Sequence, residues 1–462
     1  MAPENAALSH RYLFLSMAMM VCLLVIINVS FKIVIIDGFM FSATSLLSPL
    51  LALIYFQVLK HYNEAEQRLL LNQSLVALYL FSIGVYFLIN LPPAEYMHGN
   101  RAYQVVYTDI PKKFFAATFA FGLSFYLPQC LSALNKKPVA LPLKQAVLRS
   151  LLGGFAFFVI DFIVLFSETL QDNFIKTFID SSLITAALIL ITMTWGLVLT
   201  INKKKYTPKN SDTFITKNHR LYHLFLAFSV IITLVCLACE YRLVNFYNIF
   251  NMEASSVLFP LILITSSLTH ALFGNKANTK LIIIVIATEL IFNVLMIGLI
   301  ALPSPHYFNL TYFYKIIMPR RMLTSAFALF CVLMTNNMIL TYLEKKTWLQ
   351  PAYLRFFIAN ILAITLLWGV NETIIFSAVY PKELVNHLAL TGFFYKLIIA
   401  LIALPFMMTL LRAFQCQLNN SHTASNTVRT EIEASPSSGQ DVSSARSTAL
   451  REASMKGPQS LG

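Results

Sequence analysis

Long apolar runs separated by short polar stretches cover most of the chain. Each run has about 20 residues, enough to cross the ~30 Å hydrocarbon core of a bilayer as an α-helix. The pattern predicts twelve spans in two groups of six, divided by the polar and basic stretch at 202–220. We therefore expect an all-α polytopic membrane protein built from two six-helix repeats.

The bounds of each span follow from apolar length and from helix-breaking residues. The first group is expected at Tyr12–Ile36, Phe41–Leu59, Leu69–Leu91, Phe114–Leu134, Val147–Phe166 and Phe178–Ile201. The second is expected at Leu221–Cys239, Ala254–Leu272, Leu281–Leu302, Met322–Leu343, Tyr353–Val379 and Leu388–Leu411. The domains are then 1–201, the linker at 202–220, 221–414, and a tail at 415–462 whose polar composition predicts disorder.

Charge sets the expected orientation. The chain is 57% hydrophobic and only 12% charged, and its formal net charge is +13. About two thirds of the Lys and Arg side chains lie on one side of the predicted spans, which marks the cytoplasmic side. We expect the protein to lie in a bacterial inner membrane with both termini in the cytoplasm. We interpret the excess of positive charge as a sign of this topology rather than of binding to nucleic acid.

Two similar phrases break this charge rule. "PKKFFAATFAF" starts at Pro111 and "PRRMLTSAFAL" starts at Pro319. Each places two cations at the N-terminus of a helix, where the helix dipole disfavours them, and on the side that carries few positive charges. Anchoring to lipid headgroups is one explanation. The repetition favours a substrate-binding role for Lys112 and Arg320.

Other segments also recur with a period of about 210 residues. "SATSLLSPLLALI" resembles "EASSVLFPLILIT", and "INLPP" resembles "IALPSP". Because each half has an even number of spans, both cross the membrane in the same direction, which makes them parallel repeats. Transporters built from such repeats bind substrate near the membrane midplane.

Ionisable side chains inside spans are the main candidates for a site, because burying them in a membrane is unfavourable. Asp161 and Glu289 lie inside the fifth and ninth spans, and an interhelical hydrogen bond is the alternative role for Asp161. Asn371 corresponds to Asp161 in the second half and is followed by Glu372. Asn360 corresponds to Gly154, which favours close helix packing.

Two further features have structural alternatives. Lys32 and Arg242 lie near the ends of the first and seventh spans, where snorkelling to the interface and contact with a ligand are equally good explanations. Cys236 and Cys239 form a C-x-x-C pair on a predicted spanning helix. We interpret them as small core residues rather than as a redox or metal site.

These motifs together resemble the queuosine precursor transporter family, also called the VUT family. The similarity lies in "LFPLILI" followed by "FGNKANTK", in "PRRMLTS", and in Arg355 with Asn360, Asn371 and Glu372. The first half carries weaker versions in "LSPLLAL", in "PKKFFAA", and in Arg149 with Asp161. The resemblance implies that Arg320 and Asp161 match family residues, whereas Lys112 and Asn371 are replacements.

The resemblance also implies import of a deazapurine precursor of a modified tRNA base. The chain departs from the family in its second helix, where family members carry an Asp and then a Glu. Phe56 and Lys60 occupy these places in the first half, and Ser267 and Ala271 in the second. These differences bear directly on which substrate is carried.

The alternatives are a major-facilitator transporter of another solute and a substrate-capturing subunit that does not transport by itself. The loop signature of the first class is absent after the second span. The sequence contains no P-loop, no H-E-x-x-H and no G-x-S-x-G motif, so we expect no enzyme activity and no cofactor. The expected partners are a purine-like solute and the bilayer, with ion or proton coupling left open.

Overall fold

The computed structural model describes residues 3–94, 97, 100–107, 109–134, 142–168, 173–202, 217–246, 250–317, 322–346, 351–371 and 382–434. The chain forms two compact units, Met1–Met408 and Thr409–Gly462. The first unit contains the predicted first half and all but the last few residues of the predicted second half. In the second unit, the described residues are α-helical as far as Ala434.

The first half contains ten elements and one π-helical turn. They are α1 (Pro3–Val29), β1 (Ile33–Ile36), β2 (Phe39–Ser42), α2 (Ala43–His61), α3 (Glu64–Asn90), α4 (Asn100–Tyr107), α5 (Ile110–Phe121), the π turn (Gly122–Tyr126), α6 (Leu127–Leu134), α7 (Leu143–Phe166) and α8 (Phe174–Asn202).

The second half follows a similar order. It comprises α9 (Lys217–Ala238), β3 (Leu243–Phe246), β4 (Phe250–Glu253), α10 (Ala254–Phe273), α11 (Asn275–Ala301), a 3-10 turn (His306–Phe308), α12 (Thr311–Ile317), α13 (Met322–Glu344), α14 (Ala352–Asn371) and α15 (Lys382–Ala434). Among the described residues, 11 helices are long and apolar enough to span a membrane, and the apolar stretch Leu13–Val29 is shorter. The expected all-α polytopic fold is confirmed, while the parallel repeat stays a prediction.

The first predicted span is wrong at its end. We expected a helix through Ile36, but α1 ends at Val29 and Ile33–Ile36 forms strand β1, which pairs antiparallel with β2. Asp37 and Gly38 form the turn with φ of 48° and 84°. Asp-Gly favours such turns because both central residues need positive φ. A second hairpin, β3–β4, joins α9 to α10.

The end of the last span also differs from the prediction. We expected it to stop at Leu411 and the tail to be disordered from Gln415, but α15 continues to Ala434. Residues 435–462 lie outside the described part of the chain. The same is true of residues 372–380, where the predicted eleventh span ran on to Val379.

Each half caps a helix of the other half with a buried cation. Lys32 follows α1 and Arg242 follows α9, and each is only 2% exposed. Both donate hydrogen bonds to carbonyl groups at the C-terminus of the third long helix of the opposite half. The bonds run from Lys32 Nζ to the oxygens of Leu299, Ile300 and Leu302 at 2.8, 3.1 and 2.6 Å, and from Arg242 Nη2 to those of Ile89 and Leu91 at 2.5 and 2.8 Å.

These caps correct our expectation for the two cations. Neither Lys32 nor Arg242 snorkels to an interface, and neither lines the cavity described below. The last carbonyls of a helix have no partner within the helix, and a cation there also interacts favourably with the helix dipole. The two side chains therefore hold the halves together.

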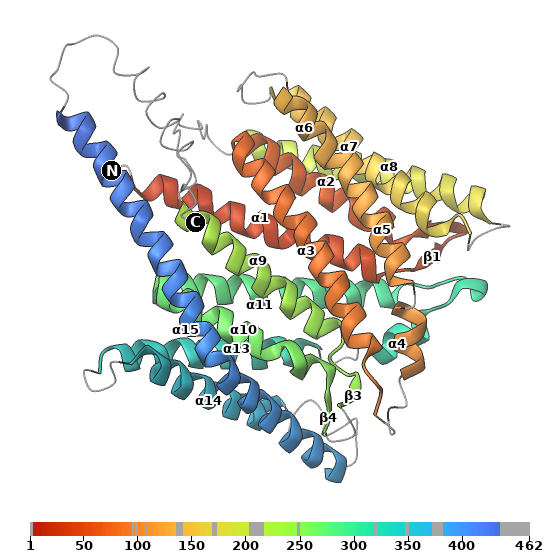
Figure 1. Ribbon diagram of the computed structural model, residues 1–462. Helices are drawn as coiled ribbons and strands as arrows, with labels where there is room; N and C mark the ends of the chain where they lie inside the picture. The colour runs from red at the N-terminus through yellow and green to blue at the C-terminus, as the bar shows by residue number, and fades with distance from the viewer. Residues whose placement is uncertain are drawn as a thin grey trace, which may run out of the picture. The chain divides into compact units, whose positions relative to one another are not determined.

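In the first half, α7 and α8 pack tightly against α2 (Figure 1). A Cβ atom added at Gly154 would lie 2.5 Å from Cβ of Ala52, and one added at Gly196 would lie 2.6 Å from Cδ1 of Leu53. Glycine permits such close approach between helices in membranes. The expected packing role of Gly154 is confirmed.

Candidate functional site

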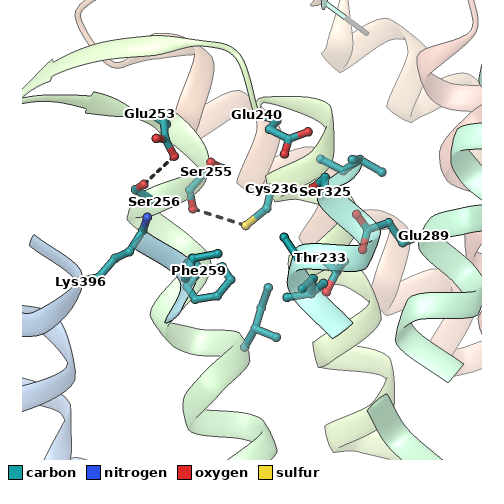
Figure 2. Close-up of a pocket in the computed structure, with 15 residues that line it drawn as sticks. Thr233, Cys236, Glu240, Glu253, Ser255, Ser256, Phe259, Glu289, Ser325 and Lys396 are labelled. Atoms are coloured by element: carbon teal, nitrogen blue, oxygen red, sulfur yellow. Dashed lines mark hydrogen bonds between the residues drawn. The ribbon is translucent and has the colours of Figure 1, made fainter. Parts of the chain in front are cut away.

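A cavity of about 50 Å³ lies within the second half. Its walls come from α9, β4, α10, α11, α13, α14 and α15, so most elements of this half contribute. Figure 2 shows polar side chains at its upper end, with carboxyl groups on two sides and a lysine approaching from α15. Buried ionisable groups around a cavity in a membrane protein are candidates for a substrate or ion site.

Three carboxyl groups line the cavity. Glu240, Glu253 and Glu289 are 6%, 2% and 1% exposed. Glu253 occupies the N-cap position of α10, where the helix dipole favours an anion, and its Oε2 accepts a hydrogen bond of 3.0 Å from Oγ of Ser256. Glu240 lies two residues beyond the C-terminus of α9, where the dipole disfavours an anion.

Glu240 and Glu289 share a partner. Ser325, near the start of α13, is a side-chain hydrogen-bond partner of both carboxyl groups. Their Oε2 atoms are buried and have no hydrogen-bond partner among the described residues. A buried acceptor without a partner is unfavourable, so these oxygens are available to a proton or a ligand.

Burial raises the pKa of Glu240, which lies beyond the spanning segment of α9, to about 7. The hydrogen bond from Ser325 lowers this pKa, and the nearby charge of Glu253 raises it. A carboxyl group with such a pKa exchanges its proton near neutral pH.

Lys396 brings the positive charge to the cavity. It is 3% exposed, and its Nζ lies 5.8 Å from the ring centre of Phe259 on α10. Cys236 completes this wall, and its Sγ lies 3.5 Å from the carbonyl oxygen of Ser255. Cys236 is buried, as expected of a small core residue, and it also lines the cavity.

Of the side chains proposed from the sequence, Glu289 lines the cavity. Asp161 lies in the first half, fully buried between α7 and α2, where its Oδ2 accepts a hydrogen bond of 3.1 Å from Oγ1 of Thr44. Its Oδ1 has no hydrogen-bond partner among the described residues. The interhelical hydrogen bond that we considered for Asp161 is present.

Asn360 lies in a polar cluster away from the cavity. Its Oδ1 accepts hydrogen bonds from Nδ2 of Asn336 at 2.9 Å and from Oγ of Ser267 at 3.2 Å. The cluster continues to Asn337, which contacts His270 at 2.7 Å. These bonds join α10, α13 and α14, so the structure gives Asn360 a helix-packing role rather than a place in the cavity.

Lys112 forms an exposed ion pair with Glu168 at 2.5 Å and does not reach the cavity. The next residue, Lys113, is buried, and its Nζ donates a hydrogen bond of 2.5 Å to the carbonyl oxygen of Val106. Three other candidates lie outside the described side chains: Arg320, Asn371 and Glu372.

Sequence reasoning missed Glu240, Glu253 and Lys396. Lys396 stands within the apolar run "FFYKLIIALIAL", and a lysine at such a place was a usable signal. Glu240 and Glu253 flank the hairpin that was not predicted, so their approach to one another depends on the turn. Among the described residues, no group of three His, Cys, Asp or Glu side chains is arranged to hold a metal ion.

Residues 253–410 match the family model described as "putative vitamin uptake transporter". The match starts at Glu253, ends inside α15, and includes Glu289, Ser325 and Lys396 of the cavity. No curated protein and no solved structure matches the chain. The second half is thus similar to a transporter family, and together with the many apolar helices this match supports a multi-pass membrane transporter.

Proposed function

We propose that the protein imports a small heterocyclic solute, a queuosine precursor of the 7-deazaguanine type, and binds it in the cavity of the second half. The observation that carries the proposal is a cavity with buried carboxyl groups and a buried lysine, most of whose lining residues belong to the segment that matches the transporter family.

The chemistry of the cavity suits such a ring. A 7-deazaguanine ring has an amino group and a ring N–H that donate hydrogen bonds, and a carbonyl oxygen that accepts one. The carboxylate of Glu253 accepts from paired N–H groups, and Lys396 donates to a carbonyl oxygen. Phe259 supplies an aromatic face on which a planar ring stacks.

The cavity must widen to hold this ring. Its volume is about 50 Å³, whereas pockets for small molecules usually enclose about 300–1,000 Å³. We infer that α14 and α15 move away from α10 when substrate enters. Such motion of one group of helices against the rest is the usual basis of alternating access.

The test is a bacterium that can neither make nor import 7-deazaguanine precursors, supplied with the precursor in its medium. Expression of the protein is expected to restore queuosine in tRNA, and Glu253→Gln or Lys396→Met is expected to remove most of this rescue. Glu64→Gln, at an exposed side chain of α3, is the matched control. No rescue by the unchanged protein, at normal expression and membrane insertion, would exclude this substrate.

We also propose that the protein lies in the bacterial inner membrane with both termini in the cytoplasm. The distribution of Lys and Arg supports this orientation. A reporter fused after Leu411 is expected to report a cytoplasmic position, and a periplasmic signal would overturn the span order.

A further inference from the structure

One wall of the cavity differs from the rest because it has two carboxyl groups facing a single hydroxyl group. Glu240 follows α9, Glu289 lies in the middle of α11, and Ser325 lies near the start of α13 (Figure 2). The hydroxyl of Ser325 has one proton to donate, so it can satisfy one ionised carboxylate at a time. The buried Oε2 atoms of both carboxyl groups have no hydrogen-bond partner in the part of the chain that the structure describes.

The other groups around the cavity decide what this wall can hold. Glu253 of β4 faces it with another carboxyl group, Cys236 of α9 with a thiol, and Lys396 of α15 with a cation. Lys396 is only 3% exposed, so its cation lies inside the protein. One cation does not offset three buried carboxylates, and two neighbouring buried carboxyl groups do not both ionise readily.

We propose that Glu240, Ser325 and Glu289 form a proton-binding site that couples movement of the substrate to movement of one proton. The inference rests on the proposed transport function. In the closed cavity, one carboxyl group holds the proton while Ser325 donates to the other. Glu253 and Lys396, across the cavity, are left to bind the solute.

The position of Ser325 links the proton to the conformation. Glu240, Glu289 and Ser325 belong to three different segments, so separating α13 from α9 and α11 removes the shared hydroxyl. Opening the cavity also admits water, which stabilises ionised carboxylates. The proton then leaves to water, and closing the cavity requires a new proton. A proton gradient thereby biases the two conformations through their different proton affinities.

The first test uses purified protein in liposomes with a labelled 7-deazaguanine precursor as the probe. An inward proton gradient is expected to drive accumulation, and a protonophore is expected to abolish it. Glu240→Gln and Glu289→Gln are expected to lose accumulation but keep exchange of internal for external probe, because exchange needs no net proton movement. The Glu64→Gln variant should keep both accumulation and exchange of the probe. Accumulation by both Gln variants equal to that of the unchanged protein, or accumulation driven by sodium at constant pH, would overturn the proposal.

A second test does not depend on the substrate. An infrared titration of the purified protein is expected to show a protonated carboxyl band near neutral pH that is missing in Glu240→Gln and in Glu289→Gln. Ser325→Ala is expected to move the midpoint to higher pH, because it removes a hydrogen bond that stabilises the ionised form. An unchanged band in all three variants refutes the proton site. If the unchanged protein moves no probe in liposomes, the proposed substrate fails and the titration alone decides the proton site.

Discussion

The two halves share an order of elements and differ in what fills their interiors. In both, a long helix leads through a β-hairpin to a second and a third long helix, and a buried cation after the first helix caps the opposite half. Inside the first half, Phe158, Phe162 and Phe166 form a buried apolar cluster. Inside the second half, the space contains carboxyl groups, a lysine and a cavity.

In the phrases that recur between the halves, two cavity residues have counterparts of a different kind: Glu253 corresponds to Ser42, and Ser325 corresponds to Ala117. The family match, at residues 253–410, lies within the second half. The comparison therefore favours the second half as the place of the proposed site.

The largest expected effect concerns uptake. Lys396→Met should lower uptake of the 7-deazaguanine probe about tenfold to a hundredfold, which corresponds to losing one charge-assisted hydrogen bond. Asp161→Asn, in the first half, keeps a hydrogen-bonding group of the same size and should leave uptake close to normal. Initial rates in whole cells, corrected for expression, measure both. An equal loss in both variants would mean that both halves bind substrate.

The next prediction concerns the feature that the halves share. Lys32→Met and Arg242→Met should each lower the free energy of unfolding by about 3 kcal/mol, because each leaves buried carbonyl groups without donors. Thermal unfolding in detergent measures the loss of stability, and the Lys60→Met variant is the control. A large effect at one position only would show that the two caps are not equivalent.

The sequence was sufficient to place the helices but not the hairpins. Apolar runs located α7 and α10 to within a few residues, because membrane thickness fixes the length of a span. The stretch "IVIIDGFMF" was assigned in part to the first helix, since its apolar character resembles that of a span. Its Asp-Gly pair was the local signal for a turn, and the continuous hydrophobicity masked it.

The site could be predicted only in part. Glu289 was found because an acid inside a span is unusual in any context. Glu253 and Lys396 approach the same cavity from β4 and α15, and no local pattern records that proximity. Asp161 met the same criterion as Glu289, yet it lies against Thr44 in a tightly packed helix contact. Burial of an acid indicates a constraint, and only the surrounding helices show whether the constraint is a ligand or a packing contact.

A smaller effect is expected from the glycines that distinguish the packing of the halves. Gly154→Ala should lower the free energy of unfolding by about 2 kcal/mol, because the new Cβ meets another Cβ and neither backbone can yield easily. Gly392→Ala in α15 is the matched substitution in the second half. Its nearest neighbours would be Oγ of Ser256 at 3.7 Å and Nζ of Lys396 at 3.8 Å, which is ordinary contact. Similar losses at both glycines would remove the packing difference between the halves.

The smallest expected effects separate two adjacent lysines. Lys113→Met should lower the free energy of unfolding by about 1–2 kcal/mol, because the buried carbonyl of Val106 loses its donor. Lys112→Met should cause no measurable change, because Lys112 pairs with the exposed Glu168 in water. The hydrogen bond and charge of Lys112 lower the pKa of Glu168, so this pair persists at neutral pH and weakens as pH falls toward that pKa. Loss of uptake in Lys112→Met without loss of stability would support the substrate-binding role expected for Lys112 from the sequence. It would also show that the first half takes part in transport.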